Sequence, residues 1–190
     1  MKKITGLAFL FLCFAAHSQI TKGNWMVGGN GNFSSSHYRG DVTVNQNKTT
    51  IAVEPKIGYF IIDKLTAGLL LRYSNNRTKS PGTTNPPQNV SSFSIGPFLR
   101  YYFLQPGQMA NVFVETSYQY GTSKTNTGSS ISNYKINSFS FSGGPVIYFN
   151  TVVGLELTVG YLTSKYINYK DYSNHLQIGL GLQIHLENEE

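Results

Sequence analysis

The carboxyl-terminal segment 175–186 alternates between apolar positions and polar or small ones. Leu or Ile occupies every even position from 176 to 186, whereas His, Gln and Gly occupy the odd positions. Because successive side chains of a β-strand point to opposite faces, this pattern predicts a strand with one wholly apolar face. Strands of soluble sandwiches seldom keep such a face for this length, so the segment indicates contact with a lipid bilayer.

Seven earlier segments repeat the alternation: residues 25–34, 50–61, 65–74, 92–103, 111–120, 138–149 and 153–161. One face of each is rich in Val, Ile, Leu, Phe and Tyr, and the other in Ser, Thr, Gly, Asn and occasional charges. Eight strands of roughly ten residues suit a tilted crossing of a bilayer core. The pattern therefore predicts an all-β fold, a closed antiparallel eight-stranded up-and-down transmembrane β-barrel.

The connections between these segments alternate in length. Those at 62–64, 105–107 and 150–151 are tight, whereas those at 37–47, 75–89, 122–133 and 164–172 are long and rich in Ser, Thr, Asn and Gly. Bacterial transmembrane barrels have short periplasmic turns and longer outer loops. The alternation thus predicts which end of the barrel faces the cell exterior.

Three prolines, Pro55, Pro97 and Pro145, lie inside predicted strands and each leads into a short turn. Proline cannot donate a hydrogen bond to a neighbouring strand, so we expect bulges or kinks at these positions. Aromatic residues near the short turns, together with Trp25, are expected to form a periplasmic girdle. An outer girdle is expected from Tyr73, Tyr118, Tyr120 and Tyr161.

The amino terminus has the parts of a secretory signal peptide. Lys2 and Lys3 precede an apolar stretch that ends near Ala16, and it is too short to span a bilayer as a helix. We expect residues 1–18 to be the signal peptide for export through the Sec pathway and residues 19–190 to be the barrel domain. Cleavage would remove Cys13, the single cysteine, and leave the mature chain without a disulfide or a thiol.

Charged residues of the predicted strands fall on the polar face, which would line the interior of the barrel. They comprise three of each sign: Glu54, Lys56, Arg72, Arg100, Glu115 and Glu156. A narrow lumen holds little water, so buried charges there must be paired, and we expect ion pairs among these six. An eight-stranded barrel is only wide enough for its own side chains, and Leu70, Phe98, Arg100 and Phe113 would fill it. No open pore is expected.

Most of the remaining positive charge falls in the predicted outer loops. The candidates are Arg39, Lys48, Arg77, Lys79, Lys124, Lys135, Lys165 and Lys170, against Asp41 and Asp171. We expect them either to contact anionic lipid headgroups and lipopolysaccharide at the cell surface or to form a solvated loop surface. An unidentified surface ligand is also left open. Neither a nucleic-acid partner nor oligomerisation is expected.

The chain resembles the small outer-membrane β-barrel family of OmpX-like proteins, particularly the "porin family" barrel domains of Bacteroidetes type. The resemblance rests on Gly23–Gly29, Pro55–Phe60 and Gly96–Phe103 and extends from about residue 19 to 186. It implies the outer membrane as location and the barrel-assembly machinery as partner during insertion. Family members usually end on an aromatic residue, whereas here the last strand ends at Leu186 before an acidic tail.

The sequence indicates no catalytic, cofactor or metal site, and no enzyme activity is expected. His175 and His185 share a face but lie too far apart along a strand to bind one metal ion. Ser173 beside His175 lacks an acidic partner for hydrolysis. Two alternatives stay open: a membrane-embedded acyl hydrolase, and a soluble lipocalin-like barrel that binds an apolar ligand. The second predicts that the Leu/Ile face of segment 175–186 points inward.

Overall fold

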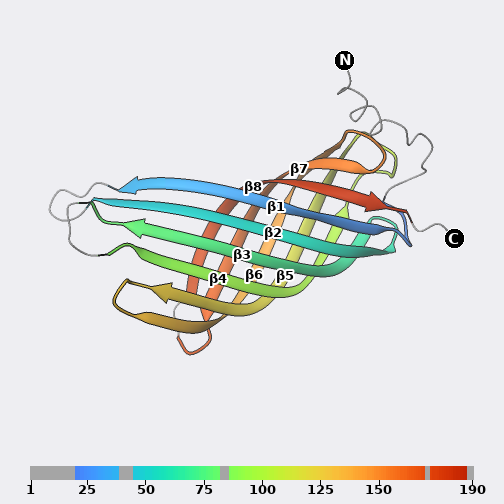
Figure 1. Ribbon diagram of the computed structural model, residues 1–190. Helices are drawn as coiled ribbons and strands as arrows, with labels where there is room; N and C mark the ends of the chain where they lie inside the picture. Colours follow the sequence, from blue (N-terminus) through green and yellow to red (C-terminus); the bar gives the residue numbers. More distant parts are fainter. Residues whose placement is uncertain (1–19, 39–44, 82–85, 170–171, 188–190) are drawn as a thin grey trace, which may run out of the picture.

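The computed structural model describes residues 20–38, 45–81, 86–169 and 172–187. Eight strands form a single closed barrel in which each strand pairs with its neighbours in the sequence and β1 pairs with β8 (Figure 1). Every pairing is antiparallel. The strands are β1 (Trp25–Tyr38), β2 (Gln46–Ile62), β3 (Leu65–Lys79), β4 (Gln88–Tyr102), β5 (Ala110–Asn126), β6 (Ile131–Tyr148), β7 (Val153–Tyr166) and β8 (Tyr172–Leu186). The predicted fold class is confirmed.

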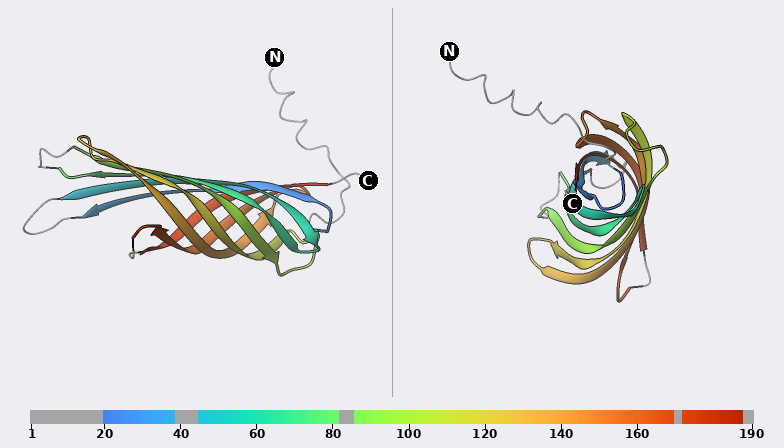
Figure 2. Two further views of the ribbon diagram at one scale, coloured as in Figure 1. Left: turned by 90° about the horizontal axis from the view of Figure 1, so that it is seen from below. Right: turned by 90° about the vertical axis from the view of Figure 1, so that its right-hand side faces the viewer.

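The strands are longer than the sequence pattern indicates, with 14 to 18 residues each. They continue into all four predicted outer loops, so the predicted loop bounds are wrong. Beyond the ring of outward apolar side chains, called the apolar band below, both faces of the strands carry mostly polar residues. Hydrophobic alternation therefore fades although the backbone ladder continues. In Figures 1 and 2 the paired strands β1–β4 extend well past the end of the β7–β8 hairpin.

Apolar side chains face outward, as expected for a barrel in lipid. Along β8, Leu176, Ile178, Leu180, Leu182, Ile184 and Leu186 are all exposed, by between 39% and 76%. The alternate positions Gln183 and His185 are buried. The soluble lipocalin-like alternative is therefore wrong, because its apolar ligand would need the Leu/Ile face inside.

Aromatic side chains gather on the outer surface at both ends of this apolar band. Near the short turns, Trp25 packs edge-on against Tyr59 with ring centroids 5.2 Å apart, and Tyr101 packs against Phe103 at 5.3 Å. Toward the other end, exposed aromatics are Tyr73, Phe93, Tyr118, Tyr120, Phe139 and Tyr161. No described residue on the outward positions between these two sets is charged. A bilayer requires such a band, since Arg or Lys at its midplane costs about 2–4 kcal/mol.

The prolines interrupt the ladders without shifting them. Val53 pairs with Tyr73 and Lys56 with Leu70, so the β2–β3 register is the same on both sides of Pro55 while two residue pairs are missing. The same two-pair gap occurs at Pro97 between β4 and β5 and at Pro145 between β6 and β7. A proline lacks the N–H that would complete the ladder. Of the bulges or kinks expected at these positions, the unchanged register excludes the bulges; the register shift in β2–β3 lies instead between Phe60 and Ile62.

The seam that closes the barrel is short. Trp25–Gly31 of β1 pairs with Leu180–Leu186 of β8, but β1 pairs with β2 as far as Tyr38. The outer parts of β1 and β8 therefore each pair with one neighbouring strand and not with each other. In Figure 1 these two strands diverge toward the end that carries the longer connections.

Candidate functional site

The centre of the barrel holds a buried network of four charged side chains from four strands. Lys56 donates to both carboxylate oxygens of Glu115, at 2.7 and 2.9 Å. The Arg100 guanidinium contacts Glu115 at 2.7 Å on one side and Glu156 at 2.7 Å on the other. All four side chains are at most 4% exposed. Two cations therefore neutralise two anions where water is excluded, as buried charge requires.

A second ion pair lies closer to the outer end. Arg72 of β3 pairs with Glu54 of β2, and both side chains are 11% exposed. Arg72 also donates to Gln177 of β8 at 3.0 Å, which links the opposite wall of the barrel. All six charged residues that the sequence places in the interior thus form ion pairs in the structure.

A layer of aromatic side chains closes the interior between this network and the short turns. Phe60, Tyr102 and Tyr148 surround the ring of His185, with centroids 5.4, 6.2 and 5.6 Å away from it. Phe113 lies under the Arg100 guanidinium, 4.0 Å from its ring centroid. Since this layer is buried, it fills the interior at this level, and the described residues leave no open passage through it.

Two of the residues that complete the network were missed by the sequence reasoning. Gln183 accepts hydrogen bonds from Arg100 at 3.0 Å and from the Tyr102 hydroxyl at 2.7 Å. Both Gln183 and Tyr102 lie at inward positions of their strands, so the alternation of the sequence could have placed them in the interior. Which inward residues meet across the lumen depends on the stagger of the strands, which a one-dimensional pattern does not contain.

Between the charged network and the outer end of the barrel, the interior is lined by small polar side chains that hydrogen-bond to one another. Ser94 donates to Gln119 at 2.8 Å, Gln119 donates to Ser117 at 3.0 Å, and Ser117 and Ser140 hydroxyls lie 2.7 Å apart. These residues are buried. Their mutual bonds rigidify the wall of β4–β6 rather than present groups to a ligand.

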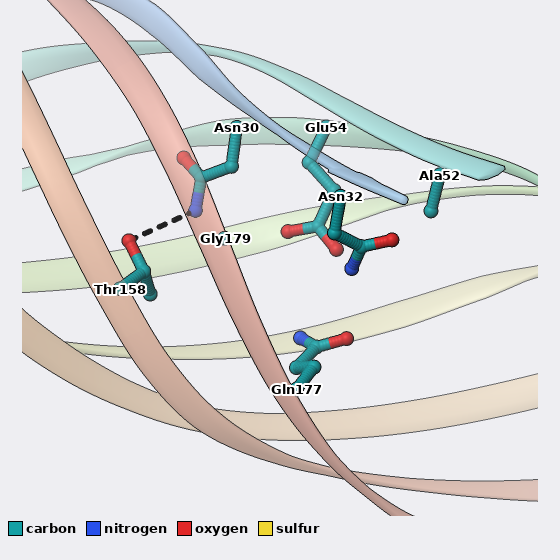
Figure 3. Close-up of a pocket in the computed structure, with 7 residues that line it drawn as sticks. All are labelled: Asn30, Asn32, Ala52, Glu54, Thr158, Gln177 and Gly179. Carbon is teal, nitrogen blue, oxygen red and sulfur yellow. Dashed lines mark hydrogen bonds between the residues drawn. The ribbon is translucent and has the colours of Figure 1, made fainter. Parts of the chain in front are cut away.

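A small cavity remains where the β1–β8 seam ends (Figure 3). Its volume is about 10 Å³, and it is lined by Asn30, Asn32, Ala52, Glu54, Thr158, Gln177 and Gly179. Asn30 donates to Thr158 across it at 3.2 Å. A volume of this size suits at most one water molecule, so the cavity is too small for a cofactor or substrate.

Most of the predicted surface cations lie on strands rather than in loops. Arg77 and Lys79 belong to β3, Lys124 to β5, Lys135 to β6 and Lys165 to β7, and all five are exposed at outward positions. The placement in loops was wrong because the strands extend past the apolar band. Lys48 lies on β2 at an inward position, and Arg39 and Lys170 fall outside the described residues. The five outward cations are called the basic belt below.

Four of the five cations of the basic belt follow the outer aromatic residues at a constant spacing. Each lies four positions beyond an outward aromatic residue of its strand: Tyr73 and Arg77, Tyr120 and Lys124, Phe139 and Lys135, Tyr161 and Lys165. Four residues span about 13 Å along a strand, or about 10 Å along the barrel axis at the usual tilt. Bilayer headgroups extend about 5–8 Å beyond each side of the hydrocarbon core. The backbone of the belt therefore lies just beyond the outer headgroups, which its long Lys and Arg side chains are able to reach.

Ser173 and His175, the residues considered for hydrolysis, lie on β8. Among the described residues His175 forms no ion pair with a carboxylate, and the charges that act on it are those of the cations Lys48 and Arg72. In the part of the chain that the structure covers, no cluster of three or more His, Cys, Asp or Glu side chains could hold a metal ion. The same residues include no helix long and apolar enough to cross a membrane.

Known proteins resemble the chain in sequence and in fold. No curated protein matches the sequence. The crystal structure of Neisserial surface protein A superposes with a TM-score of 0.53 at 14% identity, covering 86% of this chain and 97% of the other. The attachment invasion locus protein Ail of Yersinia pestis gives a TM-score of 0.44 at 10% identity, with 87% and 100% covered. The model of the outer membrane protein beta-barrel domain family matches residues 4–189, and the chain therefore belongs to this family of outer-membrane proteins.

Proposed function

We propose that this outer-membrane protein is a non-catalytic surface barrel that binds the anionic headgroups of the outer leaflet through its basic belt. The observation that carries the proposal is the recurrence of a cation four residues beyond an outward aromatic on β3, β5, β6 and β7. The aromatic residues fix the position of the barrel in the interface, and the cationic side chains are then long enough to reach the lipid phosphates.

Neighbouring strands place three of these cations close together. In the β5–β6 ladder Lys135 pairs with Thr122, and Lys124 pairs with Asn133. Lys124 and Lys135 are thus diagonal neighbours, which lie about 7–8 Å apart on one face of a sheet. Lys165 is the diagonal neighbour of Lys135 in the next ladder, because it pairs with Asn137. Such a row favours a surface of regularly spaced phosphates.

Nearby carboxylates do not neutralise the belt among the described residues. Glu54, Glu115 and Glu156 are inside the barrel, and Asp63 is in the turn at the opposite end. Basic residues near an anionic membrane surface contribute about 1 kcal/mol each. The belt is therefore able to hold the barrel at a fixed depth and to order the lipids around it.

The proposal is tested by the thermal stability of the folded barrel in bicelles. Zwitterionic bicelles are compared with bicelles doped with phosphatidylglycerol, at low and at high salt. The doped bicelles should raise the unfolding temperature, and the triple variant Lys124→Gln/Lys135→Gln/Lys165→Gln should lose most of that rise. High salt should diminish the rise as well, because it screens exposed charges.

Lys22→Gln serves as a control, because Lys22 is an exposed lysine beside the Asp63 turn at the other end of the barrel. This variant should keep the full dependence on anionic lipid. An unfolding temperature that does not respond to phosphatidylglycerol, or a triple variant that responds as the parent protein does, would refute the role of the belt.

A further inference from the structure

A groove of about 640 Å³ lies on the outward face of β1, β2 and β3, beyond the apolar band. It is lined by Ser35, Asn47, Thr49, Ile51, Asn75, Arg77 and Lys79. The strand register arranges these residues in rows: Ile51 pairs with Asn75, Thr49 with Arg77, and Asn47 with Lys79. The groove thus has apolar character at its membrane end and becomes polar and basic toward the outer end.

The two ends of the groove suit two parts of one amphiphilic molecule. At the membrane end, Ile51 is 50% exposed and pairs with Phe33, which is 70% exposed. The next outward residues toward the membrane are Val53 and Tyr73, which pair with each other and are both exposed. The apolar band therefore runs without interruption into the groove. An acyl chain lying on that band would place its own headgroup between β1 and β3.

The outer part of the groove carries the groups that recognise a phosphorylated sugar. Arg77 and Lys79 project from the same face of β3, and neither has an ion pair among the described residues. Guanidinium and ammonium groups bind phosphate by charge-assisted hydrogen bonds. Opposite them stand the Thr49 hydroxyl and the Asn47 amide. Because the Asn47 Oδ1 atom already contacts the His37 ring, the Asn47 Nδ2 group and the Thr49 hydroxyl are the neutral groups able to bond sugar hydroxyls.

We propose that this groove binds the phosphorylated sugar headgroup of a glycolipid in the outer leaflet. The inference rests on the proposed function, since it assumes contact with anionic headgroups, and it assigns one position on the belt to a specific ligand class. The belt lysines attract any anionic lipid, whereas the groove selects a lipid that carries both phosphate and sugar.

Native mass spectrometry of the folded protein released from micelles measures this selectivity directly. The probes are a bis-phosphorylated diglucosamine glycolipid, the same glycolipid without phosphates, and phosphatidylglycerol. The groove variant Arg77→Gln/Lys79→Gln should bind the phosphorylated glycolipid at least about tenfold more weakly than the parent protein. This factor corresponds to the loss of one charge-assisted hydrogen bond. The matched control Lys124→Gln/Lys165→Gln removes the same charge from the same outward surface. It should keep the preference for this glycolipid over phosphatidylglycerol.

A second variant keeps the charges and removes only the neutral groups. Asn47→Leu/Thr49→Val should bind phosphatidylglycerol as the parent protein does while losing its preference for the phosphorylated glycolipid. Retention of the heat-dependent gel shift shows that each variant is folded. Equal losses in the groove variant and the matched control would overturn the groove and leave the general attraction of the belt intact. If the stability of the parent protein does not depend on anionic lipid at all, the proposed function itself is overturned.

A soluble sugar phosphate separates the lipid from a free ligand of the same chemistry. Glucosamine phosphate should not displace the bound glycolipid, because it lacks the acyl chains that rest on the apolar band. Displacement by the soluble compound at concentrations similar to those of the lipid would overturn the assignment to a membrane ligand.

Discussion

Replacing Arg100 by methionine removes the cation that joins the two buried glutamates. Its side chain is 1% exposed and contacts both Glu115 and Glu156 at 2.7 Å. Lys56 remains to pair with Glu115, so Arg100→Met leaves Glu156 as an unpaired buried anion. Breaking a buried pair in this way costs about 3–5 kcal/mol. Methionine retains most of the side-chain volume, so little of the loss is due to a cavity.

A double-mutant cycle isolates the electrostatic part of this loss. Arg100→Met gives the four-residue network a net charge of −1 and Glu156→Gln gives it +1, whereas the double variant is neutral again. The double variant should therefore be more stable than the sum of the single variants predicts, by about 0.5–3 kcal/mol. Arg72→Met should cost less than Arg100→Met, since the Arg72 and Glu54 side chains are 11% exposed and water reaches them.

Equilibrium unfolding in urea, with the protein in lipid vesicles, provides the free energies. Trp25 is the single tryptophan. It faces outward from the barrel wall near the short turns, so its fluorescence reports transfer from lipid to water. Additive effects in the cycle would refute the idea that charge neutrality holds the interior together. A loss for Arg100→Met below about 0.5 kcal/mol would refute it as well, because this substitution removes both the ion pairs and the contact of the guanidinium with the Phe113 ring.

Three further predictions address the lipid face, the seam and the filled lumen. Leu182→Arg, on the apolar face of β8, should destabilise the barrel in vesicles by about 2–4 kcal/mol. The control Asn133→Arg lies beyond the apolar band and should change the urea midpoint little. Equal effects of the two substitutions would contradict the placement of the band. Cysteines at Val27 and Ile184 should form a disulfide under mild oxidation, because these residues pair in the β1–β8 seam. Ser35 and Leu176 would pair if the β1–β8 register continued beyond its last pair. Efficient cross-linking of cysteines at these two positions would contradict a seam that ends at Gly31 and Leu180. In planar bilayers the parent protein should insert without steady ion current, and stable open-channel steps would contradict a filled interior.

Hydrophobic alternation predicted the order of the strands and the face each residue occupies, because lipid forces apolar side chains outward at every second position. The prediction succeeded for Leu176–Leu186 and for the inward charges such as Arg100 and Glu156. It failed for strand length, because segments such as 75–79 and 122–126 are polar on both faces and look like loops. Their strand structure depends on the neighbouring ladder rather than on burial.

The contacts across the lumen were beyond the reach of the sequence pattern. Gln183 and Tyr102 meet Arg100 because the strands are staggered around the barrel, and the stagger is a property of the closed sheet. The groove has the same origin, since the outward rows of β1, β2 and β3 become a concave surface only in three dimensions. The cations Arg77 and Lys79 were found as candidates, but their polar partners Asn47 and Thr49 were not.

Gel mobility of the protein from an outer-membrane extract, with and without boiling, tests whether the chain forms a closed barrel embedded in lipid. A barrel with complete backbone ladders and an outward apolar band resists detergent at room temperature and unfolds on heating. The protein should therefore be found in the membrane fraction, and boiling should change its apparent mass. A protein recovered in the soluble fraction, with the same mobility before and after boiling, would contradict a closed barrel embedded in lipid.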